Sequence, residues 1–244
     1  MIPDPRWYES AFDREYLDVY AHRDEEDAER ALTFLEGQGL LRPGARILDL
    51  CCGNGRHVAP LCREGHRVFG FDLSQDLLRD FQARTECPVP LVRGDMRHLS
   101  FRPAFDLVLS LFTSFGYFQR DGENWLVFDE VADALKPGGA FVFDFLNAPR
   151  VEAGLIPHSE RELSDGLHVK ESRRIEHGRV IKTVRLSREG AVMRVWVESV
   201  RLFTRVEIER AMRGAGLEPT GAFGDFAAAP HGDDSPRLIL VAHR

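Results

Sequence analysis

The stretch "RILDLCCGNGRHV", Arg46 to Val58, decides the fold of this chain. A short apolar strand ends in Asp49, and a turn with glycines at Gly53 and Gly55 follows it. Two glycines this close after a strand let the backbone approach a bulky ligand. The stretch therefore predicts a strand, a glycine turn and a helix, with a ligand site at the end of the strand.

Strand-like and helix-like segments alternate after this stretch. The predicted strands cover residues 67–71, 89–92, 105–112 and 140–145, and the predicted helices cover residues 56–64, 74–84 and 122–135. Alternation at this pitch predicts a parallel sheet with helices on both faces. The core is therefore expected to be a doubly wound α/β sheet over residues 40–150 and 204–244.

Residues 6–39 show a helical pattern before the first strand. Phe12, Tyr16 and Tyr20 recur every four residues, and Arg23 follows after three, which places them on one helical face. This aromatic face lies outside the sheet's own core. We therefore expect residues 1–39 to form a helical lid over the ligand site.

A different pattern runs from residue 158 to residue 203. Apolar and polar residues alternate with a period of two, and His177–Gly178 and Glu189–Gly190 suit hairpin turns. We expect an antiparallel β insertion here, within a single domain of residues 1–244. Thr204 and Glu207 then form a capping box that starts a helix. A final hairpin makes the last strand of the main sheet antiparallel.

Composition narrows the class of protein. The 244-residue chain has a net charge of -7, which makes it a poor general binder of nucleic acid or anionic membranes. Its longest apolar runs fall well short of the ~20 residues of a spanning helix. The N-terminal "MIPDPRWYES" lacks the pattern of a signal peptide. The four cysteines do not resemble a secreted disulfide framework, so we expect reduced thiols in a cytoplasmic protein.

Carboxylates follow successive strands. Asp72 lies at the tip of the second strand, where it can accept hydrogen bonds from the two vicinal hydroxyls of a ribose. Asp95, in "RGDMR", could accept from an adenine amino group, with Met96 against the ring. A helix cap for Asp72 and a turn for Asp95 are the alternatives. Polar strand tips in succession favour a nucleoside site.

Val58 indicates which kind of nucleoside ligand the turn could bind. A dinucleotide-binding turn reads G-x-G-x-x-G, because pyrophosphate lies on the helix N-terminus. Val58 stands where the third glycine would be. Asp49 at the start of the turn suits instead a nucleoside whose tail carries an ammonium and a carboxylate. A nicotinamide dehydrogenase is therefore disfavoured.

These motifs resemble those of the class I S-adenosylmethionine-dependent methyltransferases. The matching pieces are "ILDLCCGNG", "GFDLS", "GDMR", "FDLVLSLF" and "LKPGGAFVFDF", within residues 45–147. The resemblance implies a Rossmann-like fold, S-adenosylmethionine as cofactor and S-adenosylhomocysteine as product. It implies cofactor contacts from Asp49, Cys51, Gly53, Gly55, Asp72, Leu73, Asp95, Met96 and Leu111. Cys51 stands at the family's first glycine position.

A narrower resemblance extends over nearly the whole chain. "YLDVYAHRDEEDAERA", "SLFTSFGYF" and "ESVRLFTRVEIERAMRGAGLEPT" are similar to small-molecule methyltransferases that dimethylate amino sugars, and to relatives of glycine N-methyltransferase. This resemblance implies that Tyr20 and Arg23 reach the methionine carboxylate of the cofactor. It also implies that Tyr117 occupies a substrate-facing loop.

An acceptor amine must lose a proton, and an acceptor hydroxyl needs a general base. Tyr117 and His231 are the candidates for this group, with aromatic packing and a solvated loop as their alternatives. No metal is expected, because Cys52, His57 and Cys62 are too few ligands for zinc. We expect methyl transfer to a small-molecule amine or hydroxyl, by a monomer or a homodimer.

Two other functions stay open. Residues 170–188 contain seven Lys or Arg against two Glu, and this basic segment could dock RNA or protein. We favour a solvated sheet face instead. The base-amino methylation signature D/N-P-P-Y/F is absent, since "LFTS" follows "FDLVLS". The last alternative is a module that binds the cofactor without catalysis.

Overall fold

The computed structural model describes residues 3–20, 25–163 and 166–244. The strands are β1 (Arg46–Leu50), β2 (Arg67–Asp72), β3 (Leu91–Arg93), β4 (Phe105–Ser110), β5 (Leu135–Leu146), β6 (His158–Glu162), β7 (Leu167–Glu176), β8 (Arg179–Arg188), β9 (Ala191–Arg201), β10 (Glu218–Phe223) and β11 (Arg237–His243). The helices are α1 (Tyr8–Ala11), α2 (Arg14–Val19), α3 (Glu25–Gly37), α4 (Val58–Arg63), α5 (Gln75–Arg84), α6 (Asp121–Ala134), α7 (Ala148–Gly154) and α8 (Arg205–Gly214).

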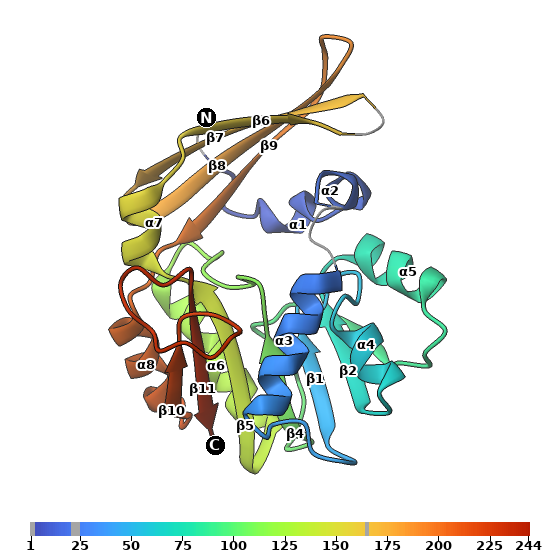
Figure 1. The fold of residues 1–244 in the computed structure, drawn as a ribbon, viewed down its shortest axis with the longest axis vertical. Coiled ribbons are helices and arrows are strands. Elements are labelled where there is room, and N and C mark those ends of the chain that lie inside the picture. The colour runs from blue at the N-terminus through green and yellow to red at the C-terminus, as the bar shows by residue number, and fades with distance from the viewer. Residues whose placement is uncertain (1–2, 21–24, 164–165) are drawn as a thin grey trace.

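The described strands form two sheets (Figure 1). The larger sheet has the order β10-β11-β5-β4-β1-β2-β3, and β1 to β5 run parallel to one another. Strand β11 runs antiparallel to both β5 and β10. The predicted doubly wound sheet with an antiparallel last strand is confirmed.

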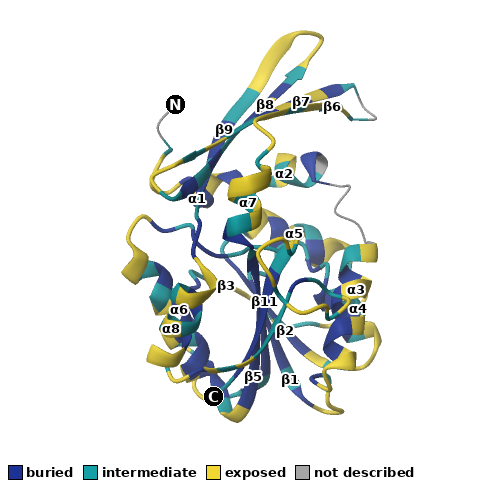
Figure 2. Cartoon of the chain, turned by 60° about the vertical axis from the view of Figure 1, so that its left-hand side comes forward, coloured by how far each residue is buried: buried dark blue, intermediate teal, exposed yellow. Residues whose placement is uncertain are grey.

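Helices cover both faces of the larger sheet (Figure 2). On one face, Leu35, Leu61 and Phe81 from α3, α4 and α5 belong to one buried cluster. On the other face, Phe128 of α6 and Ile208 of α8 belong to a second cluster. Because apolar side chains leave both faces of each central strand, both faces must be covered to remove them from water.

The smaller sheet is the predicted antiparallel insertion. Its strands pair in the order β6-β7-β8-β9. The predicted hairpin turns are confirmed: φ is +50° at His177 and +68° at Gly178, and +50° at Glu189 and +81° at Gly190. Two consecutive residues with positive φ are the mark of a type I′ turn, whose twist matches that of the strands. The capping box at Thr204 is also present.

Helices α1 and α2 lie between the two sheets (Figure 1). Arg194 of β9 attaches these helices to the smaller sheet, since its guanidinium pairs with Asp13 at 2.6 Å and with Glu15 at 3.0 Å. Arg161 of β6 donates to the carbonyl of Val19 at 2.8 Å. The N-terminal segment is therefore held by the insertion as well as by the core.

Two predicted elements differ in detail. The helix expected from residue 6 is broken, because the Asp13 carboxylate accepts from the Tyr16 N–H at 3.2 Å and starts α2 as a new helix. Strand β5 begins at Leu135 rather than at residue 140, with a register shift opposite Phe105. Residues 21–24, which include Arg23, lie outside the described residues. Within the described part of the chain, no helix is long and apolar enough to cross a membrane.

Candidate functional site

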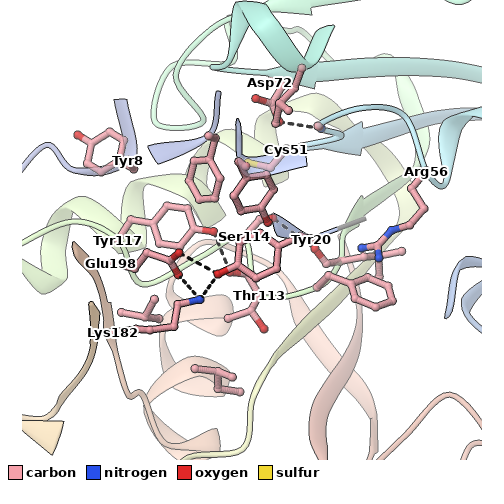
Figure 3. Close-up of a pocket in the computed structure, with 18 of the residues that line it drawn as sticks. Tyr8, Tyr20, Cys51, Arg56, Asp72, Thr113, Ser114, Tyr117, Lys182 and Glu198 are labelled. Carbon is pink, nitrogen blue, oxygen red and sulfur yellow. Dashed lines mark hydrogen bonds and ion pairs between the residues drawn. The ribbon is translucent and has the colours of Figure 1, made fainter. Parts of the chain in front are cut away.

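A cavity of about 960 Å³ lies between the carboxyl ends of the main strands and the smaller sheet (Figure 3). Its floor is formed by the turn after β1 and by the ends of β2 and β4. Its roof comes from β7, β8 and β9, and α1 and α2 form part of its wall. Ligands in open α/β sheets bind at this edge.

The turn after β1 has a left-handed backbone. Cys51 has a φ of +64°, and the N–H groups of Cys51 and Cys52 both donate to the carbonyl of Phe71, at 2.7 and 3.1 Å. Gly53, with a φ of +55°, also lines the cavity. Cys51 therefore adopts the conformation for which a glycine is ordinarily used, and this strains its backbone.

Gly55 serves a different purpose. A Cβ at this position would meet the ring of Phe81 at 2.3 Å, and Gly55 is not among the residues that line the cavity beside Asp72. Its missing side chain gives α5 room to pack against the turn. The cofactor contact that we expected from Gly55 stays a prediction that this geometry does not favour.

Asp72 is buried at the end of β2, with 8% of its surface exposed. Its carboxylate accepts from the N–H of Gly53 at 2.8 Å and from the N–H of Ser74 at 2.7 Å. Burial raises the pKa of Asp72 to about 6, although these two hydrogen bonds oppose the shift. Ser74 itself caps α5, as its position in the sequence predicts.

Asp49 and His57 lie together behind the turn. Oδ2 of Asp49 is buried with no hydrogen-bond partner among the described residues and lies 3.8 Å from Nδ1 of His57, whose Nε2 is also buried with no partner among them. His57 lines the cavity, whereas Asp49 does not. The cofactor contact that we expected from Asp49 therefore stays a prediction.

Asp95 and Met96 lie at the end of β3. Arg97 pairs with the Asp95 carboxylate at 2.6 Å. Burial disfavours the ionised form of Asp95, but the hydrogen bonds and charge of Arg97 outweigh it and hold the pKa below its usual value. Met96 Sδ lies 3.7 Å from Cys51 Sγ. Both residues line the cavity, as do Leu73 and Leu111.

The two predicted acceptor-side residues, Tyr117 and His231, lie apart. Tyr117 lines the cavity, and so does Tyr20, for which we expected a contact with the methionine carboxylate of the cofactor. The Tyr117 hydroxyl donates to the carbonyl of Thr113 at 3.0 Å, and its ring centre lies 5.0 Å from that of Trp7. His231 is not one of the described residues that line the cavity. Its Nε2 lies 3.2 Å from Oδ1 of Asn147, so it belongs to the packing of the C-terminal loop.

The charged roof of the cavity was not predicted from the sequence. Arg173, Lys182 and Glu198 line the cavity, although we expected the basic segment to be a solvated face. That expectation is wrong for Arg173 and Lys182 and correct for Lys170 and Arg185, which are exposed. The period-two pattern contained the signal, because Lys182 alternates in step with the apolar Val180, Val184 and Leu186.

Comparison with known proteins agrees with this geometry. Residues 47–139 match the family model of a methyltransferase domain. The dTDP-3-amino-3,6-dideoxy-alpha-D-glucopyranose N,N-dimethyltransferase of Streptomyces fradiae is 31% identical over 189 residues, which cover 71% of this chain and 70% of that one. The cypemycin N-terminal methyltransferase of a Streptomyces species is 29% identical over 205 residues, 82% of this chain and 84% of that one.

A solved structure shows the same fold. An S-adenosylmethionine-dependent methyltransferase from Clostridium acetobutylicum superposes with a TM-score of 0.79 at 17% identity, and covers 94% of this chain and 96% of its own. The strand order, the strand-end cavity and these relatives agree. The chain belongs to the class I S-adenosylmethionine-dependent methyltransferases, in the group that contains the amino-sugar N,N-dimethyltransferases.

Proposed function

We propose that this methyltransferase methylates the amine nitrogen of a small molecule. The observation that carries the proposal is a single cavity with the strand-end turn at one end and the charged roof at the other. Its volume, about 960 Å³, is near the top of the ~300–1,000 Å³ range of ligand pockets. It has room for the cofactor and a small acceptor. The names of the two relatives, both N-methyltransferases by description, support an amine.

In this proposal the strand ends hold S-adenosylmethionine. Asp72 accepts from the ribose hydroxyls, while Asp95 and Met96 contact the adenine and Gly53 lets the turn approach the amino-acid tail. When bound, the cofactor supplies a methyl group that its sulfonium has already activated. The protein then contributes mainly alignment and exclusion of water, and alignment alone can lower a barrier by ~7–11 kcal/mol.

Tyr117 is the proposed orienting residue. Trp7 and Phe12 hold its ring, at centroid distances of 5.0 and 5.8 Å. Because its proton is donated to the carbonyl of Thr113, its oxygen can accept from an amine N–H. We do not assign a catalytic role to His231, since Asn147 holds it outside the cavity lining.

We also propose that α1 and α2 act as the lid. They contribute Tyr8, Tyr16 and Leu17 to the cavity wall, and the flanking residues Trp7 and Phe12 line it as well. Deletion of residues 1–22 should weaken cofactor binding and leave the core folded, which calorimetry and circular dichroism can measure. Unchanged cofactor affinity in the truncated protein would contradict the lid.

A macromolecular acceptor has less support. Arg173 and Lys182, which RNA docking would need on the surface, line the cavity instead. We therefore propose a small-molecule enzyme that acts in the cytoplasm, where its four free cysteines stay reduced. We propose that its oligomeric state is a monomer or a homodimer.

The test is methyl transfer from isotopically labelled S-adenosylmethionine to a panel of primary amines and matched alcohols. Labelled N-methyl products from the amines alone would support the proposal. Products from the alcohols alone would make the amine assignment wrong. Cofactor binding without transfer to either class would favour the non-catalytic module. RNA binding that disappears at high salt and when Arg173, Arg174 and Lys182 are neutralised would favour the macromolecular alternative.

A further inference from the structure

A row of charged side chains crosses the roof of the cavity. Arg173 on β7 is paired in register with Lys182 on β8, and Lys182 with Glu198 on β9. All three line the cavity, and Figure 3 shows Lys182 and Glu198 meeting there. The adjacent pairs on the same face are apolar: Val180 with Val200, and Val184 with Trp196. Charges in an apolar face are expensive unless they are paired, so this row indicates a role in binding.

The Lys182–Glu198 pair is shielded and oriented. Lys182 Nζ lies 2.8 Å from Glu198 Oε2, and each side chain is only 15% exposed. The other carboxylate oxygen accepts from the Tyr20 hydroxyl at 3.2 Å and from Trp196 Nε1 at 3.0 Å. Lys182 also donates to the Tyr20 oxygen. Two neutral donors therefore hold Glu198 in place even when its pairing with Lys182 changes.

Arg173 extends the row with a second pair. Its guanidinium contacts Glu171, which is 4% exposed, and donates to Ser159 Oγ at 3.0 Å. Arg161 lies 3.4 Å from the same Glu171 carboxylate. Of these charged side chains, Arg173, Lys182 and Glu198 line the cavity, so the roof presents two cations and one carboxylate to a ligand. This excess of positive charge attracts an acidic group to the roof.

The pairing limits what can bind. An acidic group alone at Lys182 would lie against the Glu198 carboxylate, and a cation alone at Glu198 would lie against Lys182. A molecule with both an amine and an acidic group can replace the internal pair without leaving a buried charge unpaired.

We propose that this row selects acceptors that carry an acidic group, a carboxylate or a phosphate, beside the amine that is methylated. The amine side faces Glu198, and the acidic group pairs with Lys182 and Arg173. This inference rests on the proposed N-methyltransferase function, because it names the class of amine that the enzyme accepts.

The first test uses pairs of acceptors that differ only in the acid. The probes are an amino acid and its methyl ester, and an amino-sugar phosphate and the free amino sugar. In assays of labelled methyl transfer, kcat/KM should be about 10- to 100-fold higher for the acidic member of at least one pair. This is the effect expected when the neutral acceptor cannot form a hydrogen bond between charged groups. The pair that shows the preference distinguishes a carboxylate from a phosphate.

The second test uses matched variants on the two faces of the sheet. Lys182→Met removes the inner cation, and Lys170→Met removes an exposed one that pairs with Glu160 at 2.9 Å. The ratio of kcat/KM between acidic and neutral acceptors should collapse toward one in Lys182→Met and should persist in Lys170→Met. Circular dichroism reports whether each variant is folded, because cofactor affinity could itself change when Lys182 no longer contacts Tyr20.

The outcomes separate this inference from the proposed function. Equal use of acidic and neutral amines by the unmodified protein overturns the inference and leaves N-methylation standing. A preference for acids that survives Lys182→Met, in a variant that still binds the cofactor, also overturns it. Absence of transfer to any amine overturns the proposed function first. The comparison in the unmodified protein is decisive even if Lys182→Met does not fold.

Discussion

The floor and the roof of the cavity are built in different ways. On the floor, the backbone N–H groups of Gly53 and Ser74 hold Asp72, and all three residues lie between positions 53 and 74. On the roof, Lys182, Glu198 and Tyr20 hold one another through side chains from distant parts of the chain. The floor depends on backbone geometry, which a few sequence motifs specify together. The roof depends on side chains, which single substitutions can replace one at a time. One type of floor could therefore be combined with different roofs, each suited to a different acceptor.

The largest expected effect is on the floor. Asp72→Ala should reduce the affinity for S-adenosylmethionine by ~2–4 kcal/mol, because it removes the charged acceptor of two hydroxyls and loosens the Gly53 turn. Titration calorimetry measures the change. Asp76→Ala, at an exposed position in the first turn of α5, is the control and should bind normally. Equal affinity in both variants would show that Asp72 is not the ribose ligand.

The next largest effect is expected at the contact between β8 and the loop that carries Tyr117. Arg179 of β8 is buried and donates to the carbonyls of Gly116, Tyr117 and Phe118 at 3.0, 3.2 and 3.1 Å. Arg179→Met removes these three hydrogen bonds from a buried position and should lower the free energy of unfolding by ~2–3 kcal/mol.

Arg185→Met is the control for Arg179→Met, since Arg185 lies on the same strand but is exposed. Urea denaturation of both variants makes the comparison. Similar unfolding midpoints would mean that the loop which carries Tyr117 does not depend on the insertion.

Gly55→Ala tests packing behind the floor. The new methyl group would meet the Phe81 ring, in a backbone with a φ of +77°. Gly65→Ala is matched, because Gly65 has a φ of +85° and no atom within 4 Å of the added Cβ. Gly55→Ala should be less stable than Gly65→Ala by ~1–3 kcal/mol in urea denaturation, the cost of overpacking. Equal losses would indicate that only backbone strain matters.

The pH dependence of cofactor binding is a smaller effect. Ribose hydroxyls donate to the ionised form of Asp72, whose pKa is raised to about 6. Affinity should be full well above pH 6 and should fall by up to about tenfold per pH unit below it. The stability of the unliganded protein changes in the opposite direction. Because folding raises the pKa of Asp72 from 3.8 to about 6, its contribution to stability is full below about pH 3.8 and is lost as the pH rises to about 6.

Asp72→Asn separates this group from the others that titrate. The variant should bind more weakly at pH 7, and its affinity should change little between pH 5 and pH 7. Calorimetry at several pH values makes the measurement. A pH profile identical to that of the unmodified protein would assign the dependence to another residue.

The smallest effect is at Cys51. Glycine there would relieve a left-handed residue but would also give the unfolded chain more freedom. These terms oppose each other, so Cys51→Gly should change the free energy of unfolding by less than ~1 kcal/mol. A larger loss in thermal denaturation would show that the contact of Cys51 with Met96 stabilises the floor.

Much of the larger sheet could be predicted because its signals are local. An apolar run followed by Asp49 and a glycine turn marks a strand and its end, and Ser74 marks the helix that follows. The break between α1 and α2 was harder to predict, because the helical pattern of aromatic residues continues through Tyr16 and Tyr20. Nothing in that pattern shows that Asp13 will end one helix and cap the next. The break also depends on the smaller sheet, because Arg194 of β9 pairs with Asp13 at the start of α2.

The sequence by itself determined the class of fold, the cofactor family and the acidic residues at the strand ends, because these depend on contiguous motifs and on main-chain geometry. Only the tertiary structure decided which charges face the cavity. Arg173, Lys182 and Glu198 share a face through strand register, and register is set by pairing between strands that are far apart in the chain. A slip of one residue would have turned the same side chains to solvent.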